Sequence, residues 1–198
     1  MIFCVTGNMA AGKNYVCSIF ENAGWLCIDE DKVAHEAIKK ASPIICKEFE
    51  KEAKKAGIFL QNPDGSLNRK NLGALLFPNP DLLNRQENII YPIIIEETKK
   101  IISQNTDKNI ILNAAVLYKT PELLQLCQKI IFITAPTLIR IIRAKKRDNL
   151  PLRQIISRII SQKNLLEKYK KTGIELCIIS NFGSNKKLKN TINKKILN

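Results

Sequence analysis

The chain has 198 residues, of which 45% are hydrophobic and 25% charged, and this composition excludes extensive disorder and leaves room for one well-packed core. The formal net charge of +14 comes largely from scattered lysines, so it fits a solvated surface or a site for polyanionic small molecules as well as a nucleic-acid binder. No apolar stretch is long enough to span a bilayer, and no basic leader precedes the first apolar run at Ile2, so we expect neither a membrane protein nor a signal peptide.

The first predicted element is a buried strand, residues 2–5, that leads into a phosphate-binding P-loop. Gly7 and the pair Gly12-Lys13 have the Gly-x-x-x-x-Gly-Lys spacing, which points backbone N–H groups at one concave place. The helix predicted over residues 12–22 adds its positive dipole end there, and Lys13 supplies a cation for the outer phosphates of a nucleotide. Met9 stands where a dinucleotide fingerprint requires its middle glycine, so that alternative is excluded.

The residue after Lys13 departs from the P-loop pattern. The pattern has Ser or Thr there, whose hydroxyl binds Mg²⁺, and this chain has Asn14. The Asn14 carbonyl oxygen can act as a metal ligand, but it lies one atom further out and carries an NH₂ donor beside it. We therefore expect an intact phosphate cradle and an altered metal position.

A second buried strand, residues 25–28, is followed directly by Asp29 and Asp31. A carboxylate near a P-loop can accept a proton from a substrate hydroxyl or bind Mg²⁺. If the chain is still extended there, the two carboxylates point the same way. The alternative is that one of them caps the helix that begins near Lys32.

The middle of the chain is predicted to be helical. Residues 32–56 form a helix interrupted near Pro43, with Ser42 as the N-cap of the second part. A turn follows at residues 62–65, and two further helices are expected over 68–77 and 80–104. This stretch is too long for a simple crossover, so we interpret about 60–105 as a helical insertion that contacts substrate.

The remaining strands are predicted over residues 110–113, 129–134 and 175–180. They alternate with helices from Pro136 to about Lys146, from Pro151 to Lys170 and after Gly183. This alternation predicts an α/β fold of three layers, a five-stranded parallel sheet covered by helices on both faces, in a single domain over 1–198. Ligands of such sheets bind beyond the carboxyl ends of the strands. The P-loop, Asp29 and Asp31, residues 113–119 and Asn181 all fall at that edge, so we expect one active site.

One helix carries three arginines on a single face. Arg140, Arg143 and Arg147 have i, i+3, i+7 spacing, and arginines bind phosphate oxygens in bidentate fashion. With the next helix they predict a basic lid over about 143–170 that closes on ATP and excludes water. A solvated helix face is the alternative.

Six cysteines occur without a Cys-x-x-Cys pair, and the single His35 lies near none of them. Most lie in apolar runs, where a reduced thiol behaves as a small core side chain. These features argue against a zinc site and favour a reducing, cytoplasmic location.

Taken together, these pieces resemble the dephospho-CoA kinase family over nearly the whole length. The P-loop is generic, whereas the Asp-x-Asp-Lys-x-x-His and Asp-Gly-Ser-Leu-x-Arg segments are specific. The resembling segments are 6–13, 28–36, 64–69, 76–80, 91–94, 114–117, 147–150, 158–162 and 178–181. The resemblance implies a P-loop kinase fold with a CoA-binding helical insertion and a lid. It also implies transfer of the γ-phosphate of ATP to the 3′-hydroxyl of dephospho-CoA, with Mg²⁺ accompanying ATP.

The resemblance also implies roles for individual residues. The expected catalytic residues are Asp31 as the base, Lys13 and Arg147, and the expected Mg²⁺ ligands are Asn14 and Asp31. The expected ATP-binding residues are Gly7, Asn8, Met9, Ala10, Ala11, Gly12, Lys13, Asn14, Tyr15, Arg140, Arg143 and Asn181, the last near the adenine. The expected contacts to dephospho-CoA are Asp29, His35, Arg69, Tyr91 and Leu117.

Several positions depart from the family pattern. Asn113 stands where many members have an acidic residue, Ala115 and Lys119 replace Pro and Glu, and Tyr91 replaces the usual His. We expect a monomer that binds ATP and dephospho-CoA and no nucleic acid, with an oligomer as the alternative assembly state. The alternatives are another P-loop nucleoside or nucleotide kinase, or a basic nucleotide-dependent nucleic-acid binder; the low aromatic content of 6% disfavours the latter.

Overall fold

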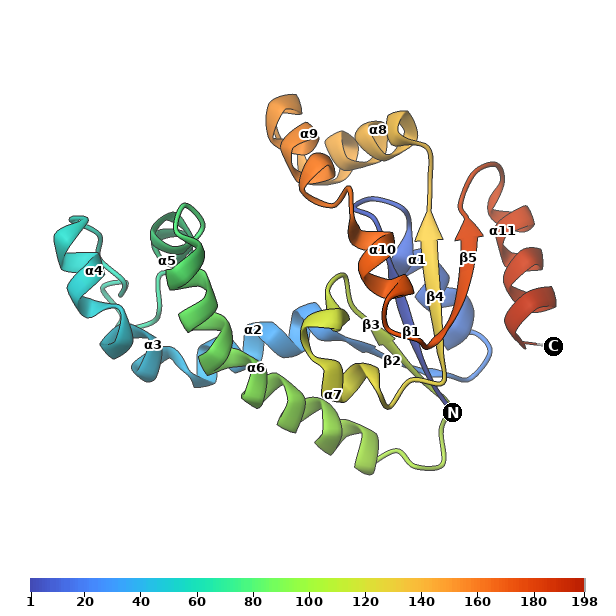
Figure 1. Ribbon diagram of the computed structural model, residues 1–198, viewed down its shortest axis with the longest axis horizontal. Helices are drawn as coiled ribbons and strands as arrows, with labels where there is room; N and C mark the ends of the chain where they lie inside the picture. Colours follow the sequence, from blue (N-terminus) through green and yellow to red (C-terminus); the bar gives the residue numbers. More distant parts are fainter. Residues whose placement is uncertain (198) are drawn as a thin grey trace. The chain divides into compact units, whose positions relative to one another are not determined.

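The computed structural model describes residues 1–197, and these divide into two compact units (Figure 1). The core unit comprises Met1–Asp29 and the chain from Ile102 onward, and the helical unit comprises Glu30–Ile101. The helical unit thus begins at the end of the second strand, well before residue 60, where we placed the start of the insertion.

The core unit is built on a five-stranded sheet. Its strands are β1 Ile2–Gly7, β2 Leu26–Asp29, β3 Ile110–Asn113, β4 Lys129–Thr134 and β5 Glu175–Ser180. Every neighbouring pair is parallel, and the strand order is β2-β3-β1-β4-β5. The predicted α/β fold with a parallel sheet is confirmed, and the near-continuous apolar strands reflect a sheet covered on both faces.

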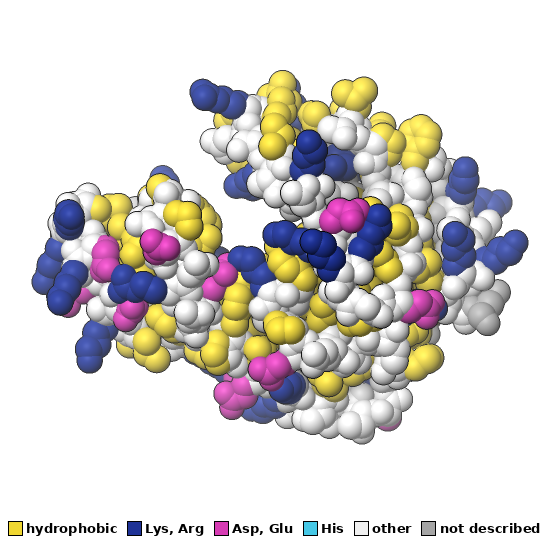
Figure 2. Space-filling model, viewed as in Figure 1, with side chains coloured by type: hydrophobic (Ala, Val, Ile, Leu, Met, Phe, Trp, Pro, Cys, Tyr) yellow, Lys and Arg dark blue, Asp and Glu magenta, His cyan; other side chains and the backbone are white. Residues whose placement is uncertain are grey.

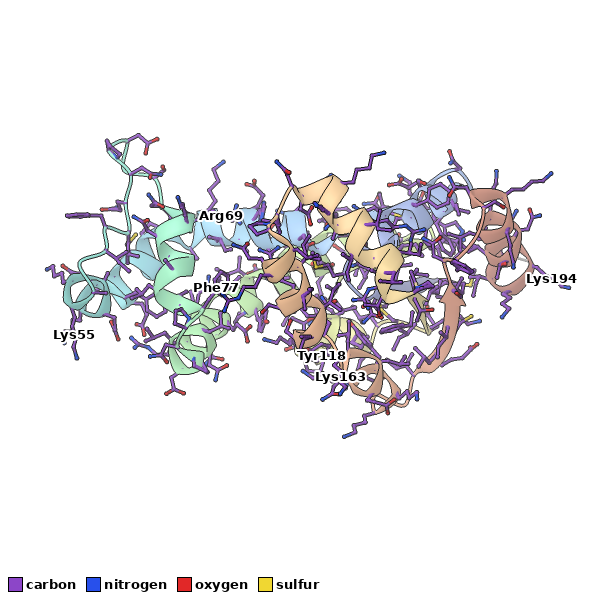
Figure 3. All side chains as sticks on the ribbon, turned by 90° about the horizontal axis from the view of Figure 1, so that it is seen from above. Lys55, Arg69, Phe77, Tyr118, Lys163 and Lys194 are labelled. Carbon is purple, nitrogen blue, oxygen red and sulfur yellow. The ribbon has the colours of Figure 1, made fainter. Side chains whose placement is uncertain are left out.

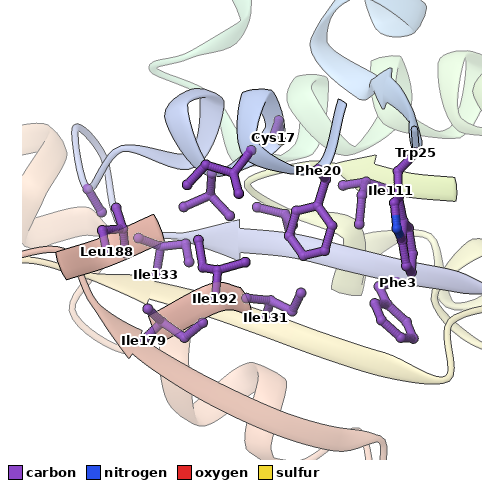
Figure 4. Close-up of a cluster of buried hydrophobic side chains, with 14 residues drawn as sticks. Phe3, Cys17, Phe20, Trp25, Ile111, Ile131, Ile133, Ile179, Leu188 and Ile192 are labelled. Atoms are coloured by element: carbon purple, nitrogen blue, oxygen red, sulfur yellow. The ribbon is translucent and has the colours of Figure 1, made fainter. Parts of the chain in front are cut away.

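Two helices cover one face of this sheet (Figure 4). The first is α1, Lys13–Glu21, whose apolar side packs against β1, β2 and β3. The second is α11, Asn185–Ile192, which packs beside β5. Phe20 of α1 lies edge-on to Trp25, with ring centroids 5.3 Å apart. The packing fixes the start of α1, and therefore the P-loop, relative to the strands.

The opposite face is covered by three short helices, which are η1 Leu117–Lys119, α7 Pro121–Leu124 and α10 Leu165–Lys170. Tyr169 of α10 is fully buried, its ring lies 6.0 Å from that of Phe132, and its hydroxyl donates to the Ala115 carbonyl at 3.3 Å. Burial raises the pKa of Tyr169 well above its usual value, so the phenol stays protonated. α10 thus anchors the lid helices, α8 Thr137–Asp148 and α9 Leu152–Ser161, to the sheet.

The helical unit contains five helices within the described chain. They are α2 Glu30–Lys40, α3 Ser42–Glu48, α4 Glu50–Lys55, α5 Arg69–Leu76 and α6 Pro80–Ser103, whose last residues belong to the core unit. The Arg85 side chain joins α6 to α3 and α4: its Nε donates to Glu48 at 2.8 Å, and its guanidinium also pairs with Glu52. The expected turn at 62–65 forms, with the Gly65 N–H donating to the Asn62 carbonyl.

Three local expectations were wrong. The chain is already helical at Glu30, so Asp29 and Asp31 do not share a side of an extended strand. Ser42 is the first residue of α3 and bonds back to the Ile38 carbonyl at 3.0 Å, so Ala41 takes the N-cap position. The helix expected from Pro151 to Lys170 is broken after Ser161, where the Gln162 side chain turns toward the P-loop.

α11 is followed by a short π-helical turn, Asn193–Leu197. Within residues 1–197, no helix combines the length and the apolar character needed to cross a membrane.

Candidate active site

The P-loop connects β1 to α1, and both of its framing glycines are required by their surroundings. A Cβ on Gly7 would lie 2.2 Å from the Ile133 carbonyl oxygen of β4, and one on Gly12 would lie 2.2 Å from Asn181 Nδ2. Both glycines also have positive φ, 146° and 99°. The loop therefore closes tightly against β4 and the residue after β5.

Asn181 braces the loop. Its side chain is buried, and its Nδ2 donates to the Ala11 carbonyl at 2.7 Å. Its backbone N–H donates to the Thr134 carbonyl at 2.7 Å, which fixes Asn181 to the end of β4. We predicted Asn181 as an ATP contact near the adenine; in the structure its side chain is directed at the P-loop backbone.

The tip of the loop is held by both lid helices. The Met9 N–H donates to Gln162 Oε1 at 2.6 Å, and Arg140 Nε donates to the Met9 carbonyl at 2.9 Å. Arg140 is buried, which lowers the pKa of its guanidinium. Both backbone groups of Met9 are thus satisfied by side chains from α8 and the end of α9. Gln162 was not among the predicted site residues, because a continuous helix there gave no sign of its contact.

A basic pocket of about 510 Å³ opens beside the loop. Its lining residues are Ala10, Gly12, Lys13, Asn14, Arg143, Lys146 and Arg147. Arg143 Nη1 is buried and has no hydrogen-bond partner among the described atoms, and it lies 4.0 Å from the Cβ position of Gly12. A buried guanidinium N–H without an acceptor beside a P-loop is suited to a phosphate oxygen.

The predicted ATP-binding residues do not all reach this pocket. Asn8 lines a separate pocket between β4 and the lid helices, and Tyr15 packs against the apolar core. Lys146, which we did not predict, lines the pocket one helical turn after Arg143, and the i, i+3 spacing is the signal that could have found it.

Arg147 lines the pocket, and its guanidinium forms an ion pair with the neighbouring Asp148. Its Nε and Nη2 donate to the two carboxylate oxygens of Asp148 at 2.6 and 2.9 Å. This contact raises the pKa of Arg147 and lowers the pKa of Asp148. The bidentate pair fixes the plane of the guanidinium at the end of α8.

The carboxyl edge of the sheet brings together three oxygen-bearing side chains of the core unit. Asp29 of β2 lies opposite Asn113 of β3, and Asn113 lies opposite Val5 of β1. Asn113 Nδ2 donates to Asn14 Oδ1 at 3.2 Å, whereas Asn113 Oδ1 is buried without a partner. The predicted convergence of strand ends is confirmed for these residues.

The side chains of Asn14, Asp29 and Asn113 are chemically suited to a hard divalent cation, because Mg²⁺ prefers carboxylate, amide and water oxygens. The set differs from the usual P-loop set, because two of its three members are neutral amides. Within residues 1–197, no group of three or more His, Cys, Asp or Glu side chains is placed to hold a metal ion.

The other predicted site residues belong to the helical unit, except Leu117. Asp31 and His35 are exposed one turn apart on α2, and Tyr91 is half-buried within α6. Arg69 is the first residue of α5 (Figure 3), where the Asn68 side chain caps the helix by accepting from the Asn71 N–H at 3.0 Å. Leu117 is only 3% exposed in the core, so its side chain is not accessible for the predicted contact to dephospho-CoA.

Glu30 sets the start of α2. Its carboxylate is buried and accepts hydrogen bonds from Thr98 Oγ1 of α6 at 3.0 and 3.3 Å. The residue before Asp31 is therefore anchored within the helical unit. Glu30 was not among the predicted site residues, because its hydrogen bond to Thr98, far away in the sequence, has no local sequence signal.

Comparisons with known proteins agree on one family. A family model described as dephospho-CoA kinase matches residues 1–186. A dephospho-CoA kinase of Treponema denticola is 35% identical over 189 residues, which cover 93% of this chain and 84% of that protein. The Treponema pallidum dephospho-CoA kinase is 34% identical over 163 residues, covering 80% of this chain and 76% of its own length.

Solved structures give the same fold. A crystal structure from Thermus thermophilus has a TM-score of 0.82 at 21% identity and covers 100% of this chain and 96% of its own. The structure of dephospho-CoA kinase from Campylobacter jejuni has a TM-score of 0.65 at 26% identity, covering 99% and 95%.

Proposed function

The chain belongs to the dephospho-CoA kinase family, and we propose that it transfers the γ-phosphate of ATP to the 3′-hydroxyl of dephospho-CoA, giving coenzyme A and ADP. The observation that carries the proposal is the basic pocket beside the P-loop, with the unpartnered Arg143 Nη1 next to Gly12. Such a donor set matches the triphosphate of a nucleotide.

The residues of the pocket divide the work of phosphoryl transfer. The P-loop N–H groups and Lys13 hold the β- and γ-phosphates, as in other P-loop enzymes. Arg143 and Arg147 neutralise the charge that develops on the transferred group. Because positioning and charge stabilisation dominate this reaction, the bracing of the loop by Asn181 and the lid matters as much as the direct contacts.

Asp31 is the proposed base. It follows β2, whose end lies at the ligand-binding edge of the sheet, and it would orient the 3′-hydroxyl and accept its proton. His35, one turn further along α2, and Arg69 of α5 are the proposed contacts to dephospho-CoA in the helical unit, with Tyr91 on α6.

Mg²⁺, bound with ATP, would neutralise charge on the β- and γ-phosphates, and Asn14, Asp29 and Asn113 are the core-unit oxygens that would face it. The lid helices α8 and α9 would exclude water from the γ-phosphate and so suppress hydrolysis of ATP. The cytoplasmic location and the monomeric state stay predictions.

The test is an acceptor screen that follows ADP release. We expect turnover with dephospho-CoA and ATP, formation of coenzyme A by mass spectrometry, and only background release without the acceptor. Coenzyme A itself, whose 3′-position is already phosphorylated, is the matched control and should not be an acceptor. Turnover on a nucleoside or nucleotide with none on dephospho-CoA would overturn the substrate assignment, and tight nucleic-acid binding at physiological salt without kinase activity would favour the binder.

A further inference from the structure

The two amides at the metal position of the P-loop form a pair. Asn113 is 8% exposed, and its Nδ2 donates to Asn14 Oδ1 at 3.2 Å, so the oxygen that stands in place of the Ser or Thr hydroxyl already has a donor. The other oxygen, Asn113 Oδ1, is buried and receives no hydrogen bond from any described atom. No donor among the described atoms is therefore already directed at this oxygen to stabilise a carboxylate in its place.

A hydroxyl and a carboxylate at these positions behave differently toward a nucleotide. The hydroxyl ligates Mg²⁺, and the carboxylate helps to hold the ion but repels the triphosphate when the ion is absent. In this chain both of these side chains are neutral, so repulsion from these two positions is missing, and Asp29, opposite Asn113 on β2, is the carboxylate of the core unit that remains at this edge.

The charges around the pocket also favour binding of ATP without a metal. Its lining includes four cations, Lys13, Arg143, Lys146 and Arg147, and no carboxylate, although Arg147 also pairs with Asp148. ATP without a metal carries more negative charge than its Mg²⁺ complex and is attracted more strongly by such a lining.

We propose that the Asn14–Asn113 pair makes ATP binding at this P-loop nearly independent of a divalent metal. The metal then serves the transfer step and contributes little to affinity. The inference rests on the proposed function in taking ATP as the nucleotide, and it concerns binding alone.

The test is calorimetric titration of ATP into the intact chain, once with EDTA and once with MgCl₂. For the unaltered protein we expect dissociation constants that agree within about threefold. Asn113→Asp introduces the missing charge and should weaken metal-free binding by about tenfold or more. In Asn14→Ser/Asn113→Asp, Mg²⁺ should restore much of that loss, because a hydroxyl and a carboxylate again face the ion.

Asn190→Asp on the exposed side of α11 is the matched control, since it adds the same charge away from the pocket and should leave both constants unchanged. Metal-free ATP binding to the unaltered protein that is ten times weaker than binding with Mg²⁺ would overturn the inference, and this measurement needs no variant. An unchanged metal-free constant in folded Asn113→Asp would also overturn it. Failure of the acceptor screen with intact ATP binding would contradict the proposed substrate and leave this inference standing.

Discussion

At the scale of single residues, the P-loop depends on close contacts that a side chain at Gly12 would disrupt. The backbone of Gly12 has a positive φ of 99°, and its missing side chain is the space that Asn181 Nδ2 occupies. That nitrogen in turn satisfies the Ala11 carbonyl at 2.7 Å. Gly12 and Asn181 therefore form one contact between the loop and the residue after β5, and this contact is visible only in the structure, although the sequence indicated both residues.

Asp31 has two possible roles that a single variant separates. In the first turn of α2 a carboxylate interacts favourably with the helix dipole. At an exposed position this interaction stabilises the helix by about 0.3–1 kcal/mol. As the base, it would contribute about 10²–10⁴-fold to the rate. We expect Asp31→Asn to lower kcat by that factor while the melting temperature changes only slightly, measured by ADP release and thermal unfolding.

The matched control for Asp31→Asn is Glu36→Gln, which removes an exposed carboxylate from the same helix and should keep kcat. A small stability loss with unchanged kcat in Asp31→Asn would show that Asp31 only stabilises the start of α2.

At the scale of elements, the strands and the helix α8 were predictable, and the break between α9 and α10 was not. β3, β4 and β5 occupy the predicted ranges because buried parallel strands are short apolar runs bounded by polar residues. The break between α9 and α10 has no Gly or Pro to mark it, and Gln162 at this break contacts Met9, which lies far away in the sequence. Local patterns contain no information about such a tertiary contact.

The same distinction holds for the site. The P-loop and Arg143 follow from spacing within one segment, whereas the pairing of Asn14 with Asn113 requires β1 and β3 to be neighbours in the sheet. The burial of Leu117 was missed because the short helices η1 and α7 were not predicted, and these fold the segment after β3 back onto the sheet.

The link between lid and loop gives a prediction at this scale. Gln162→Leu keeps the approximate size of the side chain but removes the acceptor of the Met9 N–H, and an unpaired amide costs about 1–3 kcal/mol. We expect ATP binding to weaken by about tenfold, because the loop loses part of its preorganisation. Calorimetry gives the affinity, and hydrogen exchange should become faster at the Met9 amide.

Gln154→Leu is the control for this lid variant, since Gln154 is an exposed residue of α9. Equal effects of the two variants on ATP affinity would contradict a specific role for the contact with Met9.

At the scale of the whole molecule, the dominant feature is the net charge of +14. Lys and Arg side chains are spread over the face shown in Figure 2, including the edge where α11 lies, and the described ion pairs are mostly exposed. Dispersed like charges destabilise a compact chain through mutual repulsion, and salt screens this repulsion. The same screening weakens the attraction between the basic pocket and a polyanionic nucleotide.

Salt should therefore change stability and ATP binding in opposite directions. Between about 0.05 M and about 0.5 M NaCl we expect the melting temperature to rise by a few degrees while the dissociation constant of ATP increases about tenfold. Replacing Lys186 and Lys189 on α11 by Glu lowers the net charge away from the pocket. This variant should gain less stability from salt yet keep the same salt dependence of ATP binding. A melting temperature that falls with salt would contradict the repulsion, because the ion pairs would then outweigh it.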